Sequence, residues 1–255
     1  MTVHLVGAGP GDVDLLTMKA ARLIAAADVV VHDYLADPSI LTLARPDAEI
    51  IDVGKRPGRP TPQAMINALL VHLGAQGVEV VRLKGGDPYV FGRGGEEAEA
   101  LLAAGIPFDV VPGISSSIAA PAAAGVPVTH RGVSASFTVV TGHRESGGST
   151  DIEWEALAQV GGTIVVLMGV AERAAIAARL IAGGLAADTP VAAVRWGTRP
   201  EQHTTRTTLG QLGDAPLEAP TTIVIGAVAG LDLTPAPGAG EFHRAASHSL
   251  AAGGQ

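Results

Sequence analysis

The chain has 255 residues, of which 47% are hydrophobic and only 3% aromatic, so we expect an aliphatic core in one large domain or two smaller ones. The formal net charge of −8 argues against broad nucleic-acid binding, and no apolar run is long enough to span a membrane. The chain has no cysteine, which excludes disulfides and thiolate chemistry, and it does not begin with the basic segment of a signal peptide. We therefore expect a cytoplasmic protein with no membrane or nucleic-acid partner.

The first half of the chain alternates β-like and helical segments. Asp12 is the expected N-cap of the first helix, and Thr61 with Pro62 is expected to open the second. The hydrophobic patterns predict strands at 3–6, 28–32, 50–53, 78–83 and 108–111, and helices at 13–27, 61–73 and 95–104. This alternation predicts a mostly parallel sheet with helices on its faces.

Pro112 and Gly113 mark a break, after which a second series of elements begins. We expect helices at 115–124 and 171–182, and strands at 137–141, 163–167, 190–196, 202–208 and 222–225. The closely spaced late strands favour a mixed sheet. We therefore divide the chain into an N-terminal α/β domain (1–112), a C-terminal α/β domain (113–233) and a tail (234–255) whose composition predicts disorder.

The segment from Arg82 to Glu97 is the most informative in the chain. It directly follows an expected strand and carries five glycines, three basic residues and three carboxylates. Glycines at the end of a strand let the backbone approach a ligand closely, and the charged residues provide recognition.

Gly7-Ala8-Gly9-Pro10-Gly11 joins the first expected strand to the first expected helix. It is not a dinucleotide fingerprint, because Asp12 replaces the third glycine and Pro10 lacks the N–H that a pyrophosphate would use. A tight turn and a backbone wall for an uncharged part of a ligand both remain open. Asp33 and Lys55 each follow an expected strand, at the edge where α/β sheets bind ligands. Taken alone, Asp33 is more simply interpreted as a loop cap, and Lys55 as a solvated surface lysine.

Two other classes of site are poorly supported. The run Gly113-Ile114-Ser115-Ser116-Ser117 lacks the final glycine of a serine-hydrolase elbow, and a helix cap explains it. The histidines do not show the spacing of metal ligands, so we expect no metal.

Taken together, the chain resembles the uroporphyrinogen-III C-methyltransferase family, a branch of the S-adenosylmethionine-dependent tetrapyrrole methylases. The resemblance covers roughly residues 3 to 230, and the run Gly92 to Glu97 with Thr129-His130-Arg131 is its most specific part. The segments that carry it are 6–12, 15–17, 84–97, 111–116, 125–131, 167–169 and 197–198.

The resemblance implies two α/β domains of the class III methyltransferase type, with the active site in the cleft between them and a homodimer as the usual assembly. The implied reaction transfers methyl groups from S-adenosyl-L-methionine to C2 and C7 of uroporphyrinogen III. The products would be S-adenosyl-L-homocysteine and precorrin-2, for siroheme or cobalamin biosynthesis. No NAD-binding siroheme-synthase domain precedes the methylase part, so dehydrogenation and iron insertion are expected to be absent.

The resemblance also assigns individual residues. Asp33 and Lys55 match positions with acid/base roles, and Arg93 is assigned with them as a catalytic residue. Arg93 also matches a substrate-side position, as do Glu96, Arg131 and His143. Tyr34 departs from the family, which often has a basic residue there. The residues expected to contact S-adenosylmethionine are Pro10, Gly85, Gly86, Asp87, Val90, Ser115, Ser116, Met168, Gly197 and Thr221.

Three other functions use the same features. A later precorrin methylase is disfavoured by the run from Arg93 to Glu97. A methylase of the wider superfamily would act on RNA or protein, and the acidic charge disfavours RNA. A nucleotide-sensing or metabolite-binding protein without catalysis requires only the glycine-rich loops. A test of methyl transfer to uroporphyrinogen III distinguishes all of these functions from uroporphyrinogen-III C-methylation.

Overall fold

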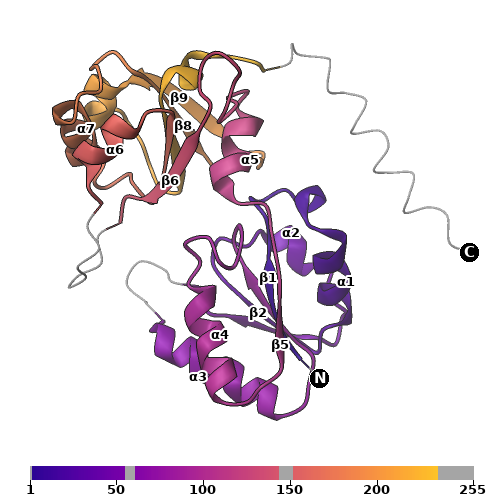
Figure 1. Cartoon of the computed structure of the whole chain (residues 1–255). Coiled ribbons are helices and arrows are strands. Elements are labelled where there is room, and N and C mark those ends of the chain that lie inside the picture. The colour runs from indigo at the N-terminus through magenta and orange to yellow at the C-terminus, as the bar shows by residue number, and fades with distance from the viewer. Residues whose placement is uncertain (1, 55–60, 144–151, 235–255) are drawn as a thin grey trace, which may run out of the picture.

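The computed structural model describes residues 2–54, 61–143 and 152–234. These residues build two five-stranded sheets, each with its own helices, and the segment from the fifth strand into the fifth helix joins the two lobes (Figure 1). Within the described residues, no helix is both long and apolar enough to cross a membrane.

The first sheet is entirely parallel, as the alternating pattern predicted. Its strand order is β3-β2-β4-β1-β5, with β1 (Val3–Gly7), β2 (Val29–His32), β3 (Glu49–Asp52), β4 (Val80–Lys84) and β5 (Phe108–Val111). A parallel sheet that is covered on both faces needs strands that are apolar on both sides, and the fully buried Val30 and Val31 satisfy this requirement.

Helices cover both faces of the first sheet (Figure 1). On one face, α1 (Met18–Ala26) and α2 (Pro38–Leu41) pack Ile24 and Ile40 against the strands. On the other face, α3 (Gln63–Ala75) and α4 (Gly94–Ala103) pack Leu70 and Leu101. The loops at the carboxyl ends of the strands therefore stand on a rigid three-layer base.

The second sheet is mixed, also as expected. Only β6 and β7 are parallel to each other as neighbours, and the other three pairings are antiparallel. The order is β6-β7-β10-β8-β9, with β6 (Phe137–Thr141), β7 (Thr163–Leu167), β8 (Pro190–Arg195), β9 (His203–Thr208) and β10 (Thr221–Ile225).

One face of the second sheet packs against α6 (Trp154–Val160), α7 (Arg173–Ala182) and the 3₁₀ segment η2 (Leu209–Asp214). The opposite face packs against α5 (Ser116–Ala123) and η3 (Ala227–Gly230). Because α5 follows β5 directly, it connects the two lobes and also contributes to the core of the second one.

The structure corrects the expected helix at 13–27. It contains a short 3₁₀ turn, η1 (Val13–Leu15), with Asp12 as its N-cap, and then the separate helix α1. The break occurs because Leu16 is extended and the hydroxyl of Thr17 accepts a hydrogen bond from the N–H of Ala20 at 3.1 Å, which caps a new helix.

Other boundaries also differ from the expected ones. Thr61 is not the N-cap of α3, because the helix begins at Gln63 and Pro62 occupies the cap position without a side-chain hydrogen bond. Two short helices, α2 and α6, were not predicted. The tail predicted to be disordered lies outside the described residues from position 235 onward.

Candidate functional site

The carboxyl ends of the five parallel strands lie at one edge of the first sheet, and most of the N-terminal candidate residues follow these strands. Pro10 follows β1, Asp33 follows β2, Asp87 follows β4 and Ser115 follows β5. We call the loops 8–11, 33–37, 85–93 and 112–115 the first-sheet edge. Open α/β sheets bind ligands at such an edge, so the structure brings these candidates to a suitable place.

Three of the loops pack backbone against backbone. A Cβ added at Gly113 would lie 2.2 Å from the carbonyl oxygen of Gly86, and one added at Gly7 would lie 2.5 Å from the Cα of Gly113. No real side chain tolerates such distances, so glycine is required at both positions. The close packing holds the loops after β4, β1 and β5 against one another.

Hydrogen bonds fix the same loops. The N–H of Gly9 donates to the carbonyl of Gly86 at 3.1 Å, and the N–H of Gly86 donates back to the carbonyl of Gly9 at 2.8 Å. Asp87 accepts from the N–H of Tyr89 at 2.8 Å through Oδ1 and from the N–H of Gly113 at 3.0 Å through Oδ2. The Asp87 carboxylate is thereby held in one orientation at the edge, with lone pairs left on both oxygens.

The loop from 88 to 93 continues into α4. Phe91 and Arg93 have φ values of 52° and 60°, a left-handed conformation that is uncommon for residues other than glycine. Arg93 donates through Nε and Nη2 to the two carboxylate oxygens of Glu96, both at 2.7 Å. Val90, in the same loop, is 38% exposed. The structure thus joins two of the predicted substrate residues in a bidentate ion pair on the surface.

Ser115 and Ser116 lie at the start of α5. Ser115 is the N-cap, and its hydroxyl accepts from the N–H of Ser117 at 3.3 Å. Gly85 packs on the loop after β2, because a Cβ there would lie 3.0 Å from the Cβ of Leu35. Both serines and Gly85 are half-buried rather than enclosed in a core.

The C-terminal candidates gather at one edge of the second sheet. His143 follows β6, Met168 follows β7, Gly197 follows β8 and Thr221 begins β10, which runs in the opposite direction to β7 and β8. We call these four positions and their loops the second-sheet edge. Met168 has a φ of 56° and is 52% exposed, whereas a Cβ at Gly197 would lie only 2.5 Å from the Cβ of Ala120 in α5.

The two edges contact each other through residues that follow β8. The hydroxyl of Thr198 accepts from the N–H of Asp12 at 3.2 Å, and Arg199 Nη2 donates to the carbonyl of Leu35 at 2.7 Å. Arg199 also pairs with Asp37 at 3.4 Å and stacks over the ring of Trp196, 4.6 Å from its centroid. The sequence analysis missed both Thr198 and Arg199, although Thr198 belongs to a motif that carried the resemblance.

A second feature that the sequence analysis missed is a group of charges beneath Asp33. Arg82, Lys84 and Glu97 are each at most 1% exposed, and Arg82 Nη2 donates to Asp33 Oδ1 at 2.6 Å. Burial lowers the pKa of Lys84, and the nearby Arg82 guanidinium lowers it further, while the Glu97 and Asp33 carboxylates act in the opposite direction. In the sequence, this buried charge group is indicated by the two basic residues at alternate positions of an apolar strand.

The structure does not bring two candidates to these edges. Arg131 lies in the turn from His130 to Ser134 that precedes β6, and Ser134 hydrogen-bonds to Thr163 at the start of β7. This turn is therefore at the end of the second sheet opposite Met168 and His143. Lys55 lies outside the described residues.

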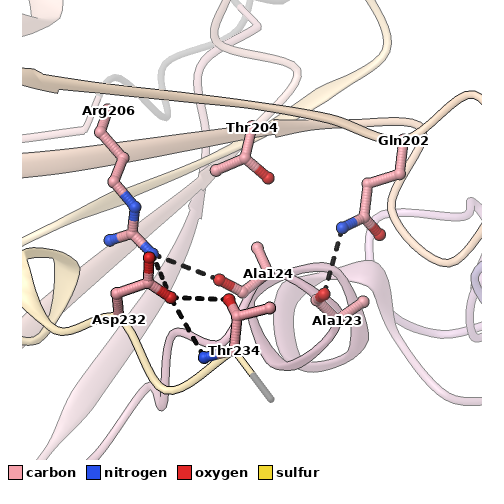
Figure 2. A pocket seen from close by; sticks show the side chains of 7 residues that line it. All are labelled: Ala123, Ala124, Gln202, Thr204, Arg206, Asp232 and Thr234. Atoms are coloured by element: carbon pink, nitrogen blue, oxygen red, sulfur yellow. Dashed lines mark hydrogen bonds and ion pairs between the residues drawn. The ribbon is translucent and has the colours of Figure 1, made fainter. Parts of the chain in front are cut away.

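A pocket of about 430 Å³ lies elsewhere, and none of the predicted site residues lines it. Figure 2 shows that Gln202, Arg206, Asp232 and Thr234 bond to other residues of its wall. Arg206 donates to the carbonyls of Ala229, Leu231 and Ala124, and Asp232 accepts from Thr234. These contacts close the second lobe, so we assign them a structural role. The lining residues are Ala123, Ala124, Gln202, Thr204, Arg206, Asp232 and Thr234.

Comparison with known proteins decides the family. Residues 2–213 match the profile of the Tetrapyrrole (Corrin/Porphyrin) Methylases. The chain belongs to this family. The tetrapyrrole methylase is 50% identical over 232 residues to the uroporphyrinogen-III C-methyltransferase of Synechocystis, covering 89% of this chain and 88% of that protein.

Two further relatives support membership of the same family. It is 52% identical over 233 residues to the siroheme synthase of Neisseria meningitidis serogroup B, covering 90% of this chain but only 48% of that protein. It superimposes with a TM-score of 0.79, at 40% identity, on the Thermus thermophilus uroporphyrin-III C-methyl transferase complexed with S-adenosylhomocysteine, covering 89% of this chain and 93% of that one. The predicted family and fold class of the tetrapyrrole methylase are therefore confirmed.

Proposed function

We propose that this tetrapyrrole methylase transfers methyl groups from S-adenosyl-L-methionine to C2 and C7 of uroporphyrinogen III and yields precorrin-2 for siroheme or cobalamin biosynthesis. The observation that carries the proposal is the meeting of two edges at Thr198 and Arg199. Each edge presents residues predicted to contact the donor, Asp87 on one and Met168 on the other. The names of the Synechocystis and Thermus relatives support the same reaction.

The first-sheet edge fits S-adenosylmethionine. Gly86 has a φ of 67°, which favours glycine, and a Cβ there would reach only ordinary van der Waals contact with Ser115 at 3.8 Å, so no part of the described chain fills that position. The ordered Asp87 carboxylate can accept hydrogen bonds from hydroxyl or ammonium groups. When bound, S-adenosylmethionine supplies an electrophilic methyl group on a sulfonium. Pro10, Gly85, Val90, Ser116, Gly197 and Thr221 would complete its contacts.

The macrocycle is expected to bind beside Arg93. Uroporphyrinogen III carries eight carboxylates, which suit an arginine fork. Glu96 already orients this fork, and exposed Tyr89 and Phe91 in the same loop provide apolar surface for the rings. In this arrangement the substrate can be recognised by an acidic protein because local charge, and not net charge, decides binding.

Asp33 is proposed to accept the proton that the cationic ring system loses after one of its carbons is methylated. Its side chain is 30% exposed at the first-sheet edge, and Oδ1 is held by Arg82. A positioned carboxylate can act as a general base and also stabilise positive charge that develops on the ring. Lys55, whose position follows β3 in the sequence, is proposed as the second acid/base group.

We propose a cytoplasmic homodimer as the working form. This proposal rests on the resemblance and on the lack of cysteine. His143, at the second-sheet edge, is proposed to contact the substrate, as the resemblance implies. Arg131 is not part of this proposal, because its turn lies at the opposite end of the second sheet.

The experiment that tests the function is methyl transfer under anaerobic conditions. Purified protein is incubated with methyl-labelled S-adenosylmethionine and uroporphyrinogen III, and the tetrapyrrole product is analysed by mass. We expect two labelled methyl groups on each macrocycle. Oxidised uroporphyrin III is the matched control, since its aromatic carbons are not nucleophilic. Failure to label uroporphyrinogen III, at a protein concentration that binds the donor, would overturn the proposal.

A further inference from the structure

Four charged side chains form a connected group between β4 and α4, beneath the first-sheet edge. Val80, Arg82 and Lys84 occupy every second position of β4, so all three project from the same face of the sheet. Val80 packs on that face in the core beside α3 and α4. Glu97 projects from α4 toward them and is fully buried. Asp33, after the neighbouring strand β2, is the one member that reaches the surface.

Glu97 is the centre of this group. Its Oε1 accepts from Arg82 Nε at 3.1 Å, from Lys84 Nζ at 2.9 Å and from Gln63 Nε2 at 3.2 Å. Buried charges are costly unless they are paired and hydrogen-bonded. Glu97 therefore holds both cations of β4 at defined positions inside the lobe.

The guanidinium of Arg82 connects the buried Glu97 to Asp33 at the surface. Nε donates to Glu97, Nη1 donates to the carbonyl of Leu83 at 3.2 Å, and Nη2 donates to Asp33 Oδ1 at 2.6 Å. With three bonds to three different groups, the planar fork has one orientation. Within the described part of the chain, the structure records no hydrogen bond to Asp33 Oδ2, so that oxygen is available at the edge.

We infer that Glu97 and Arg82 are positioning residues for the reaction: Glu97 fixes the Arg82 guanidinium, which holds Oδ1 of Asp33 and presents Oδ2 to the substrate. The inference rests on the proposed role of Asp33 as proton acceptor. A merely stabilising role explains the arrangement less well, because well-packed apolar residues often replace a buried ion pair at no cost in stability. Functional side chains, in contrast, need a supporting shell that locks their geometry.

The test is a double-mutant cycle on the single-turnover rate of methyl transfer. Arg82→Lys keeps the positive charge but cannot bridge Glu97 and Asp33 in the same plane. We expect this variant to lower the rate about tenfold to a hundredfold in the wild-type background, as expected for a misplaced catalytic group. In the Asp33→Asn background the same change should alter the rate less than about twofold, because the group that Arg82 positions has already lost its function.

A matched control makes the same substitution in a partly exposed ion pair of the second lobe. Arg179 forms a bidentate pair with Glu155 between α6 and α7, so Arg179→Lys should leave the single-turnover rate unchanged in both backgrounds. Affinity for S-adenosylhomocysteine, measured by calorimetry, should stay within about twofold in Arg82→Lys, since the inference concerns proton transfer and not donor binding. If Arg82→Lys does not fold, Glu97→Gln, which keeps the side-chain volume and an acceptor oxygen, enters the same cycle with a smaller expected loss of rate.

The outcomes separate the inference from the proposed function. If Asp33→Asn alone leaves the rate unchanged, the acid/base role of Asp33 is overturned, and the inference with it. If Asp33→Asn is slow and Arg82→Lys lowers the rate equally in both backgrounds, the inference alone is overturned, because Arg82 then acts independently of Asp33.

Discussion

Asp87 accepts a hydrogen bond from the backbone N–H of Gly113 at 3.0 Å, and this bond ties the loop after β4 to the loop after β5. The two residues are 26 positions apart in the sequence, and each belongs to a segment that carried the resemblance to the methylases. The bond explains why a carboxylate and a glycine are both needed at this edge. The carboxylate satisfies a backbone donor, and the glycine allows the backbones to approach.

Asp87→Asn should weaken donor binding. An amide has one acceptor oxygen in place of two, so one of the N–H groups of Tyr89 and Gly113 would face an NH₂ group and lose its partner, at a cost of about 1–3 kcal/mol. We expect the affinity for S-adenosylhomocysteine, measured by calorimetry, to fall about fivefold to 150-fold, as such a cost implies. Asp232→Asn, which changes a similar turn outside both edges, should leave the affinity unchanged. Equal affinities of the two variants would contradict this role of Asp87.

Gly113→Ala should destabilise the first lobe. The new Cβ would lie 2.2 Å from the carbonyl oxygen of Gly86, and backbone on both sides prevents a simple adjustment. We expect the free energy of unfolding in urea to fall by about 1–3 kcal/mol, the range for overpacking. Gly95→Ala in α4, where a Cβ meets no atom within 4 Å, is the control and should leave the stability unchanged or slightly higher. A fully stable Gly113→Ala protein would refute the packing argument.

Arg93→Ala should impair use of uroporphyrinogen III more than donor binding. The change removes a positive charge beside the proposed polyanion and, with it, the bidentate partner of Glu96. We expect kcat/KM for the tetrapyrrole to fall about tenfold to a hundredfold, since charged hydrogen bonds contribute roughly 1.5–3 kcal/mol. Arg22→Ala, on the surface of α1, is the control. Unaltered tetrapyrrole kinetics in Arg93→Ala would rule out a substrate contact at this position.

Arg199→Lys should loosen the contact between the two edges. A lysine cannot at once donate to the carbonyl of Leu35, pair with Asp37 and stack its head group flat on Trp196. We expect the affinity for S-adenosylhomocysteine to fall severalfold, by roughly 1 kcal/mol, because the donor is proposed to bind between the edges. Arg45→Lys, which pairs with Asp28 away from this contact, should bind normally. An Arg199→Lys protein with wild-type affinity would show that the contact does not support the donor site.

Asp109→Asn should change how stability depends on pH. Partial burial raises the pKa of Asp109, but hydrogen bonds from Lys19 and His4 outweigh burial and hold the pKa below its usual value. A lowered carboxyl pKa stabilises the fold above the unfolded value of about 3.9, and this contribution is lost as the pH falls through the lower folded value. In urea unfolding at pH 7 the variant should be less stable by about 0.5–1 kcal/mol, because the pair is partly exposed. The difference should shrink below pH 4, and a difference that grew on acidification would contradict the assignment.

Most strands were predictable because they contain a run of apolar residues, such as Val29 to Val31. Most helix boundaries were not, since local hydrogen bonds decide them: the hydroxyl of Thr17 starts α1 within a segment whose apolar spacing continues through it. The periodic spacing identifies the face of a helix but does not show where one helix stops and another begins.

The candidate site was predictable where glycine patterns and strand ends marked it, as at Gly86 and Asp87. The contacts that connect the site were not, because Arg82 meets a carboxylate 49 positions away and Arg199 meets a carbonyl 164 positions away. Sequence spacing alone cannot reveal such pairs. A charged residue at alternate positions of an apolar strand nevertheless indicates that a buried partner must exist.

The most direct measurement is a crystal structure of the protein with S-adenosylhomocysteine. We expect ligand density between the first-sheet edge and the second-sheet edge, in contact with Asp87 and Ser115 from one lobe and with Met168 and Gly197 from the other. Density in the pocket lined by Gln202 and Arg206, or on one lobe alone, would contradict this expectation.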